Sequence, residues 1–210
     1  METLWRTAAS IIWLMTAALV LVRTNRSACT LYRVQALGEA TLAGILAQAS
    51  GDASLWFAVV AVLVLKVIVV PAILQHAHPS LGKDYGSRSP LGMTTLAFAM
   101  AGLTIAGILI GPWIETRQPL VTGILFGSWL IALMQTSARY ETWSLAWALL
   151  SLDTLSGSLA LVVGNPLPEL ADLSIVGASI ALALMLALLI ARIAEMKKTT
   201  DVRNLKELTG

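Results

Sequence analysis

The stretch Ala53–Leu74 reads ASLWFAVVAVLVLKVIVVPAIL and carries one charged side chain, Lys66. At ~1.5 Å per residue, a helix of this length crosses a hydrocarbon core of ~30 Å, with the lysine past its centre. A lysine at that depth costs at least about 2.5–3.5 kcal/mol on insertion scales. Val62 and Val70 share its helical face, so its partners must come from another helix. Pro71 has no N–H for the carbonyl of the preceding turn, which predicts a kink or loosened turn beside the lysine.

The composition identifies an integral membrane protein. The chain is 57% hydrophobic and 12% charged, whereas soluble domains average roughly 25% charged residues. The few basic residues lie at predicted loop ends and form no single patch, so lipid is an expected partner and nucleic acid is not. One cysteine, Cys29, excludes an internal disulfide framework, and His76 and His78 have no nearby third ligand. We therefore expect no metal site and no bound cofactor.

Apolar runs separated by turn-forming residues predict an all-α, polytopic membrane fold with about seven transmembrane helices. The predicted spans are 4–22, 28–49, 53–74, 91–113, 119–137, 142–163 and 173–193. They make up a transmembrane domain over residues 1–193, followed by a polar tail, 194–210, expected in the cytoplasm. Small residues repeat as Gly107-xxx-Gly111 and Gly123-xxx-Gly127 on consecutive spans, which favours internal packing of these spans over a dimer seam.

Basic residues predict the orientation of the chain. With the N-terminus outside, ten of the fourteen Lys and Arg residues fall on the cytoplasmic side and two on the outer side. Arg33 and Lys66 lie within spans, and Arg33 is near enough to a helix end to reach the headgroups. The bias predicts a multi-pass membrane protein with its N-terminus outside and its C-terminus in the cytoplasm; the family resemblance described below implies the bacterial cytoplasmic (inner) membrane.

Three ionisable residues lie near the middle of the membrane. Glu39 and Asp153 are each roughly 17 Å from the cytoplasmic end of their spans, and Lys66 is roughly 12 Å from the same face. Gln35 precedes Glu39 by one turn and shares its helical face. These four residues are the candidate ion or proton pathway. Two readings remain open, because such charges can relay protons or can merely hold helices in register.

A weak internal repeat accompanies these charges. Arg26 precedes Glu39 by thirteen residues, and Arg139 precedes Asp153 by fourteen. Each acid is followed by a half-helix rich in small residues. Spans one to three and five to seven would then be two parallel three-helix units that flank a linking helix.

Three stretches resemble the hydrogenase-4 membrane component E family. They are Arg26-Ser-Ala-Cys-Thr-Leu-Tyr32, Lys66-Val-Ile-Val-Val-Pro71 and the tail Asp201–Gly210, DVRNLKELTG. That family belongs to formate hydrogenlyase and related membrane-bound [NiFe] hydrogenase complexes. Through it, the three-helix units look like subunit K of respiratory complex I, which carries glutamates on two consecutive helices. Here Glu39 matches the first acid, whereas Lys66 stands where the second would be expected.

The resemblance implies a non-redox membrane subunit of a complex-I-like or hydrogenase complex, catalytically inactive alone, that contributes to proton or ion translocation and to membrane anchoring. Its expected partners are antiporter-like and other membrane subunits and a peripheral hydrogenase or dehydrogenase arm. Two alternatives belong to other classes, a stand-alone ion-coupled transporter and a purely structural scaffold. A transporter would need further polar groups around a substrate cavity, and the sequence offers few.

Overall fold

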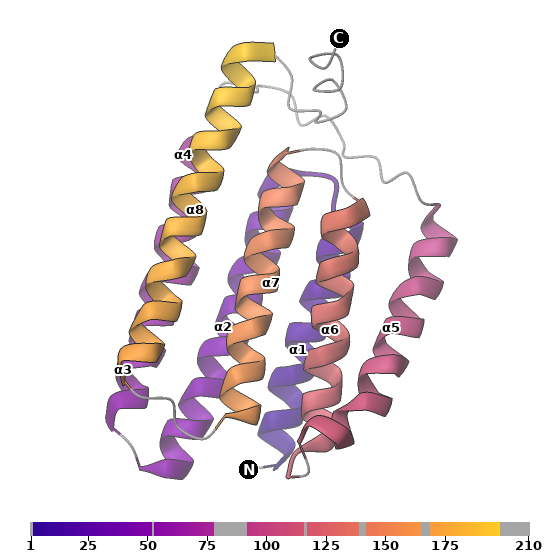
Figure 1. Ribbon diagram of the computed structural model, residues 1–210, viewed down its shortest axis with the longest axis vertical. Coiled ribbons are helices and arrows are strands. Elements are labelled where there is room, and N and C mark those ends of the chain that lie inside the picture. Colours follow the sequence, from indigo (N-terminus) through magenta and orange to yellow (C-terminus); the bar gives the residue numbers. More distant parts are fainter. Residues whose placement is uncertain are drawn as a thin grey trace.

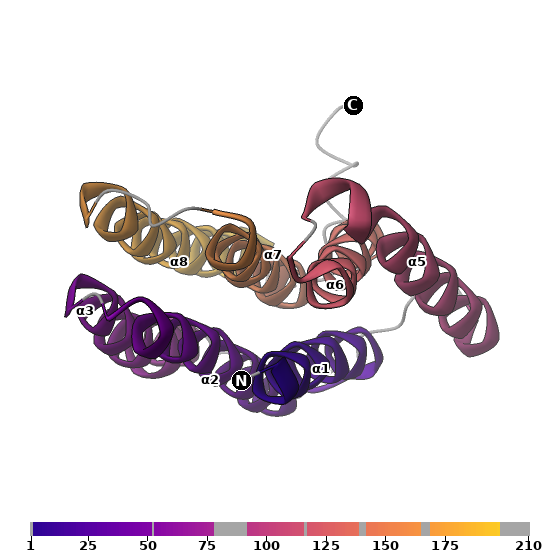
Figure 2. The same cartoon turned by 90° about the horizontal axis from the view of Figure 1, so that it is seen from below.

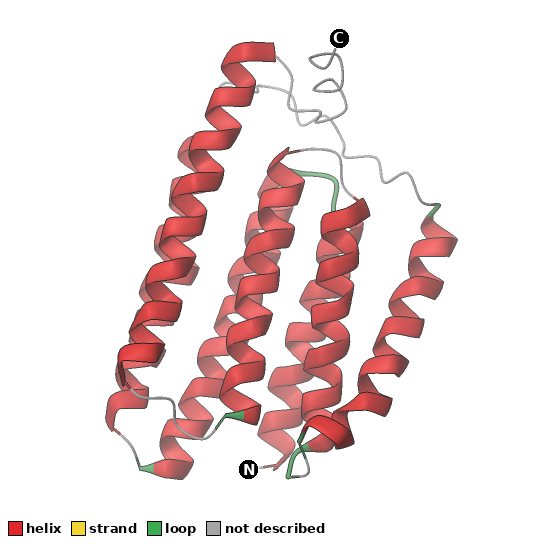
Figure 3. Ribbon diagram, viewed as in Figure 1, coloured by secondary structure: helices red, strands yellow, loops and turns green. Residues whose placement is uncertain are grey.

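In a computed structural model, the described parts of the chain are helices joined by short loops (Figure 3). The structure describes residues 2–51, 53–77, 92–115, 117–138, 142–164 and 169–197. The elements in chain order are α1 (Glu2–Leu21), α2 (Asn25–Ser50), α3 (Ala53–Val62), the π-helix η1 (Leu63–Val69), α4 (Val70–Ala77), α5 (Met93–Ile114), α6 (Pro119–Ala138), α7 (Thr142–Val163) and α8 (Glu169–Lys197).

The predicted all-α, polytopic membrane fold is confirmed. Each predicted span corresponds to one helical run, with α3, η1 and α4 forming the third. In the described part of the chain, five helices are long and apolar enough to cross a membrane: α1, Leu55–His76, α5, α6 and α7. Helix α2 is not among them because its polar residues lower its hydropathy, and α8 contributes a shorter apolar run, Gly177–Arg192.

Local sequence explains where α2 begins and ends. The Thr24 hydroxyl accepts a hydrogen bond from the Ser27 N–H at 3.3 Å, as an N-cap residue does. At the other end, Gly51 has φ 70° and donates its N–H to Ala47 O at 3.0 Å. A residue without a Cβ takes this left-handed conformation readily, so the chain turns here directly into α3.

The bundle consists of two layers of helices that lie face to face (Figure 2). One layer contains α1, α2 and the α3–η1–α4 run, and the other contains α6, α7 and α8. Across the interface α1 packs on α6, α2 on α7, and α4 on α8. Successive helices alternate in direction (Figure 1), so each helix faces a counterpart that runs the same way. This arrangement matches the two parallel three-helix units expected from the sequence, with α5 as the linking helix.

Helix α5 lies at the edge of the bundle against α6 (Figures 1 and 2). The two helices approach so closely that a Cβ added at Gly107 would lie 2.5 Å from Gly123 O and from Gly127 Cα. A Cβ at Gly111 would lie 2.8 Å from the backbone N and Cα of Gly123. The repeated small residues therefore pack within this chain, as the sequence predicted.

Several predictions fall on residues outside the described ranges. Helix α8 continues to Lys197, past the predicted end of the transmembrane domain at residue 193. Most of the predicted tail, including the family-like stretch Asp201–Gly210, lies beyond the described residues, and so does His78.

Candidate functional site

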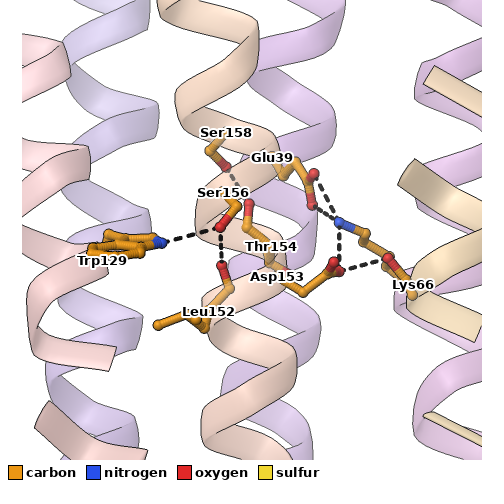
Figure 4. Close-up of polar contacts among 9 residues, drawn as sticks. Glu39, Lys66, Trp129, Leu152, Asp153, Thr154, Ser156 and Ser158 are labelled. Atoms are coloured by element: carbon orange, nitrogen blue, oxygen red, sulfur yellow. Dashed lines mark hydrogen bonds and ion pairs between the residues drawn. The ribbon is translucent and has the colours of Figure 1, made fainter. Parts of the chain in front are cut away.

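Lys66 is buried inside the bundle and contacts two carboxylates (Figure 4). Its Nζ lies 3.0 Å from Glu39 Oε1 and 3.1 Å from Oε2, and 3.2 Å from Asp153 Oδ2. The side chain of Lys66 is 0% exposed, that of Glu39 3% and that of Asp153 18%. The structure thus brings into contact three residues that the sequence placed at a similar depth, and we call them the charged triad.

The π-helix η1 positions the lysine. Leu63–Val69 forms i→i+5 hydrogen bonds, and the last of them runs from the Val70 N–H to Leu65 O. Pro71 follows directly, and its ring would clash with a carbonyl one α-helical turn earlier. Widening the helix at this point relieves that conflict, and π segments of this kind are frequent at functional sites. The loosened turn predicted from Pro71 is thus present, and it contains Lys66 itself.

Each carboxylate comes from a different layer. Glu39 extends from the middle of α2, and Asp153 from the middle of the facing helix α7. Gly157 on α7 leaves the space that Glu39 occupies, because a Cβ there would clash with Glu39 Oε1 and lie 3.6 Å from Lys66 Nζ. The lysine therefore bridges the two layers through their central helices.

Ser179 on α8 completes the polar contacts of Asp153. Its hydroxyl donates to Asp153 Oδ2 at 2.6 Å, and its side chain is fully buried. Ser179 follows Asp153 by 26 residues, much as Lys66 follows Glu39 by 27. The second layer thus carries a neutral hydroxyl near the position that the lysine occupies in the first.

Gln35 lies one turn from the triad and does not enter it. Its Nε2 donates to Thr16 Oγ1 at 3.0 Å and to Ser151 Oγ at 2.8 Å, so it joins α2 to α1 and α7. Sharing a helical face with Glu39 did not bring it to the same partners. The sequence analysis grouped Gln35 with the three charged residues, whereas the structure bonds it to two hydroxyls that the sequence did not single out.

The charge balance of the triad is uneven. Two carboxylates face one ammonium, so the fully ionised triad carries a net charge of −1 in a site that water hardly reaches. An uncompensated buried charge is expensive, and such a group takes up a proton or a counter-ion instead. Two acids that share one base can therefore hold one exchangeable proton between them.

A resident metal ion would have to displace the lysine. Among the described residues, no three His, Cys, Asp or Glu side chains come together as metal ligands would. The point between Glu39 and Asp153, where a cation would be held, is occupied by Lys66 Nζ. The ammonium is thus the chain's own counter-ion for these carboxylates.

Comparison with family models, with curated proteins and with solved structures finds no match to this chain.

Proposed function

We propose that this chain is a non-redox membrane subunit of a complex-I-like or membrane-bound hydrogenase complex, in which the charged triad takes part in proton translocation. One observation carries the proposal: a single buried ammonium lies between two carboxylates that belong to different helical layers. Such a site gains or loses one proton while Lys66 keeps both layers connected. Intramembrane ionisable groups that pair with one another are typical of proton relays.

The resemblance to hydrogenase-4 component E supports the choice of host complex. The stretches that carry it in the described residues, Arg26–Tyr32 and Lys66–Pro71, lie at the beginning of α2 and at the triad. The redox chemistry would then belong to partner subunits, with antiporter-like subunits and a peripheral hydrogenase or dehydrogenase arm as neighbours. In that setting the triad would pass protons laterally or across the membrane.

We further propose that the N-terminus lies outside the bacterial inner membrane and the C-terminus in the cytoplasm. Arg23 lies in the loop between α1 and α2, and Arg26 lies in the first turn of α2. Arg192 lies toward the same end of the bundle, near the end of α8. Arg6 and Arg117 lie toward the opposite end. An excess of Lys and Arg marks the cytoplasmic side of membrane proteins.

Affinity purification of the tagged full chain from its native membrane in mild detergent tests the assembly. We expect antiporter-like membrane subunits and a peripheral large subunit with nickel-ligand cysteines to co-purify, as identified by mass spectrometry. Recovery of the chain alone or only with itself would overturn the subunit proposal and favour a stand-alone transporter.

Proton coupling is tested in inverted vesicles that contain the assembled complex. Lys66→Met should abolish electron-transfer-driven acidification, read with a fluorescent pH probe, while the complex still assembles on a blue-native gel. The matched control is Gln135→Met, which removes another buried polar side chain, one that donates to Leu19 O away from the triad. Full coupling in Lys66→Met would exclude a role for the triad in translocation.

A further inference from the structure

Three polar atoms near the charged triad are buried without a direct hydrogen bond of ordinary geometry among the described residues: the Tyr32 hydroxyl, Gln35 Oε1 and Thr154 Oγ1. The two hydroxyls face each other, so one O–H of the pair still lacks an acceptor. Tyr32 and Thr154 are 0% exposed, and Gln35 is 1% exposed. Buried polar groups are nearly always hydrogen-bonded, to protein or to ordered water, so three orphaned groups in one region indicate a ligand.

The residues that carry these atoms lie on the facing sides of α2 and α7. Gln35 lies three residues after Tyr32 on α2, so the two share a helical face. Gln35 also donates to Ser151, which lies one turn before Thr154 on α7. The Tyr32 hydroxyl faces Thr154 and lies within the electrostatic range of Lys66 and both carboxylates of the triad. The orphaned groups thus line one region between α2 and α7, next to the triad.

Water is the ligand that fits these groups. A buried water molecule binds to between two and four polar partners, and it can donate to one while accepting from another. The Tyr32 and Thr154 hydroxyls can do either, and Gln35 Oε1 can only accept. We propose that Tyr32, Gln35 and Thr154 hold ordered water beside the triad, and that this water connects Glu39 to the end of the bundle where α2 begins.

The distribution of buried residues along α2 gives the direction. Before Glu39, its buried face carries Tyr32 and Gln35, whereas after Glu39 it carries apolar residues only: Ala40, Leu42, Ala43, Ile45 and Ala47. The buried face of α2 is therefore polar only on the side of Glu39 that leads toward Asn25.

Trp147 continues this path toward the first residue of α2. Its ring lies against Tyr32, with centroids 5.4 Å apart and an interplanar angle of 45°. Its Nε1 donates to Asn25 Oδ1 at 2.6 Å. Trp147 thus connects Asn25, at the beginning of α2, to Tyr32 and the other orphaned groups.

The chemical step is a proton transfer without other reactants. A proton enters at the Asn25 end as a hydrated proton and moves to the water beside Tyr32. It leaves this water for a carboxylate oxygen of the triad, and the water is reprotonated from the same end. The water site stands on the structure alone, whereas its role as a proton entry rests on the proposed function.

Hydroxyl-radical footprinting of the full chain in lipid nanodiscs tests the water site. Radiolysis creates radicals from bound water, so a buried side chain that touches water is oxidised. After correction for intrinsic reactivity, we expect Tyr32 to be oxidised several-fold faster than Met100, which is 9% exposed in an apolar cluster. Equal or slower oxidation of Tyr32 in the unsubstituted protein would overturn the proposal.

Matched variants locate the water. Thr154→Val should lower Tyr32 oxidation several-fold, and Thr154→Ser should retain it, because serine keeps the hydroxyl. Thr122→Val is the control, since Thr122 also has a buried, orphaned hydroxyl but lies near the opposite end of the bundle, at the beginning of α6. A fall in Tyr32 oxidation in the Thr122 variant, or none in Thr154→Val, would contradict the assignment.

The same variants separate the water site from the proposed function. If water is present, Thr154→Val should also slow proton coupling several-fold while Thr154→Ser preserves it. Oxidised Tyr32 together with unchanged coupling in Lys66→Met would leave the water site intact and overturn translocation by the triad. If Tyr32 is protected from oxidation and Lys66→Met loses proton coupling, the water site is overturned and the role of the triad in translocation stands.

Discussion

Replacing Lys66 by methionine removes the ammonium that both carboxylates of the charged triad contact. Methionine is close in size, so the change isolates the charge. Removing one partner of a buried ion pair costs about 3–5 kcal/mol, because the other charge is left uncompensated. Glu39 should account for most of this loss, since it is 3% exposed and both its oxygens bond to the lysine. Asp153 is 18% exposed and keeps its bond from Ser179.

Thermal unfolding in nanodiscs, followed by the fluorescence of the seven tryptophans, measures the effect. A loss of 3–5 kcal/mol should lower Tm by about 6–20 °C, given about 2–4 °C per kcal/mol for chains of 150–250 residues. The matched control is the neutral triple variant Glu39→Gln, Lys66→Met and Asp153→Asn. Most of the lost Tm should return in it, because no buried charge remains. A triple variant as unstable as Lys66→Met alone would refute the electrostatic reasoning.

Three further predictions concern the packing around the triad and the ends of the helices. Gly157→Ala places a methyl group against Glu39 and should lower Tm, with a cost of about 1–3 kcal/mol for overpacking, and should reduce proton coupling; unchanged values in both assays would contradict the geometry. Gly107→Ala should separate α5 from α6, because the added methyl group would meet backbone atoms of α6. The measurement is proteolysis between these helices, which should be faster than in the control Gly102→Ala, where the added methyl group meets nothing. Thr24→Ala removes the α2 N-cap and should cost about 1 kcal/mol in the same unfolding assay, whereas Thr24→Ser should be nearly neutral.

Much of the fold follows from one-dimensional properties of the chain. Apolar length and turn residues placed the helical runs close to their observed positions, because a membrane leaves the backbone few alternatives to helices. Depth alone brought Glu39, Lys66 and Asp153 to one level. The contacts between them required the two layers to lie face to face, and the sequence suggested that arrangement only through its weak internal repeat.

The remaining features depend on how each helix is rotated about its axis. Ser179 is one of two serines in the largely apolar helix α8, so no periodic pattern distinguishes it from an ordinary packing serine. Gln35 shares a face with Glu39, yet that face meets α1 as well as α7, and the nearest hydroxyls there are Thr16 and Ser151. Tyr32 and Thr154 become notable only when their burial and missing partners are known.

The polar character of α2 has a consequence for how the protein enters the membrane. Helix α2 falls short of the hydropathy expected of an independent membrane span. The run Leu55–His76, in contrast, is the most apolar of the five helices that reach that hydropathy in the described part of the chain. The two are joined by a turn at Gly51 and carry the opposite charges of the Lys66–Glu39 pair. During synthesis they should therefore leave the translocon together as a hairpin, with the glutamate already neutralised, long before α7 is made. A long polar insertion at Gly51 would separate the two helices. Helix α2 would then meet the lipid with Glu39 unpaired, and it should fail to insert into the bilayer.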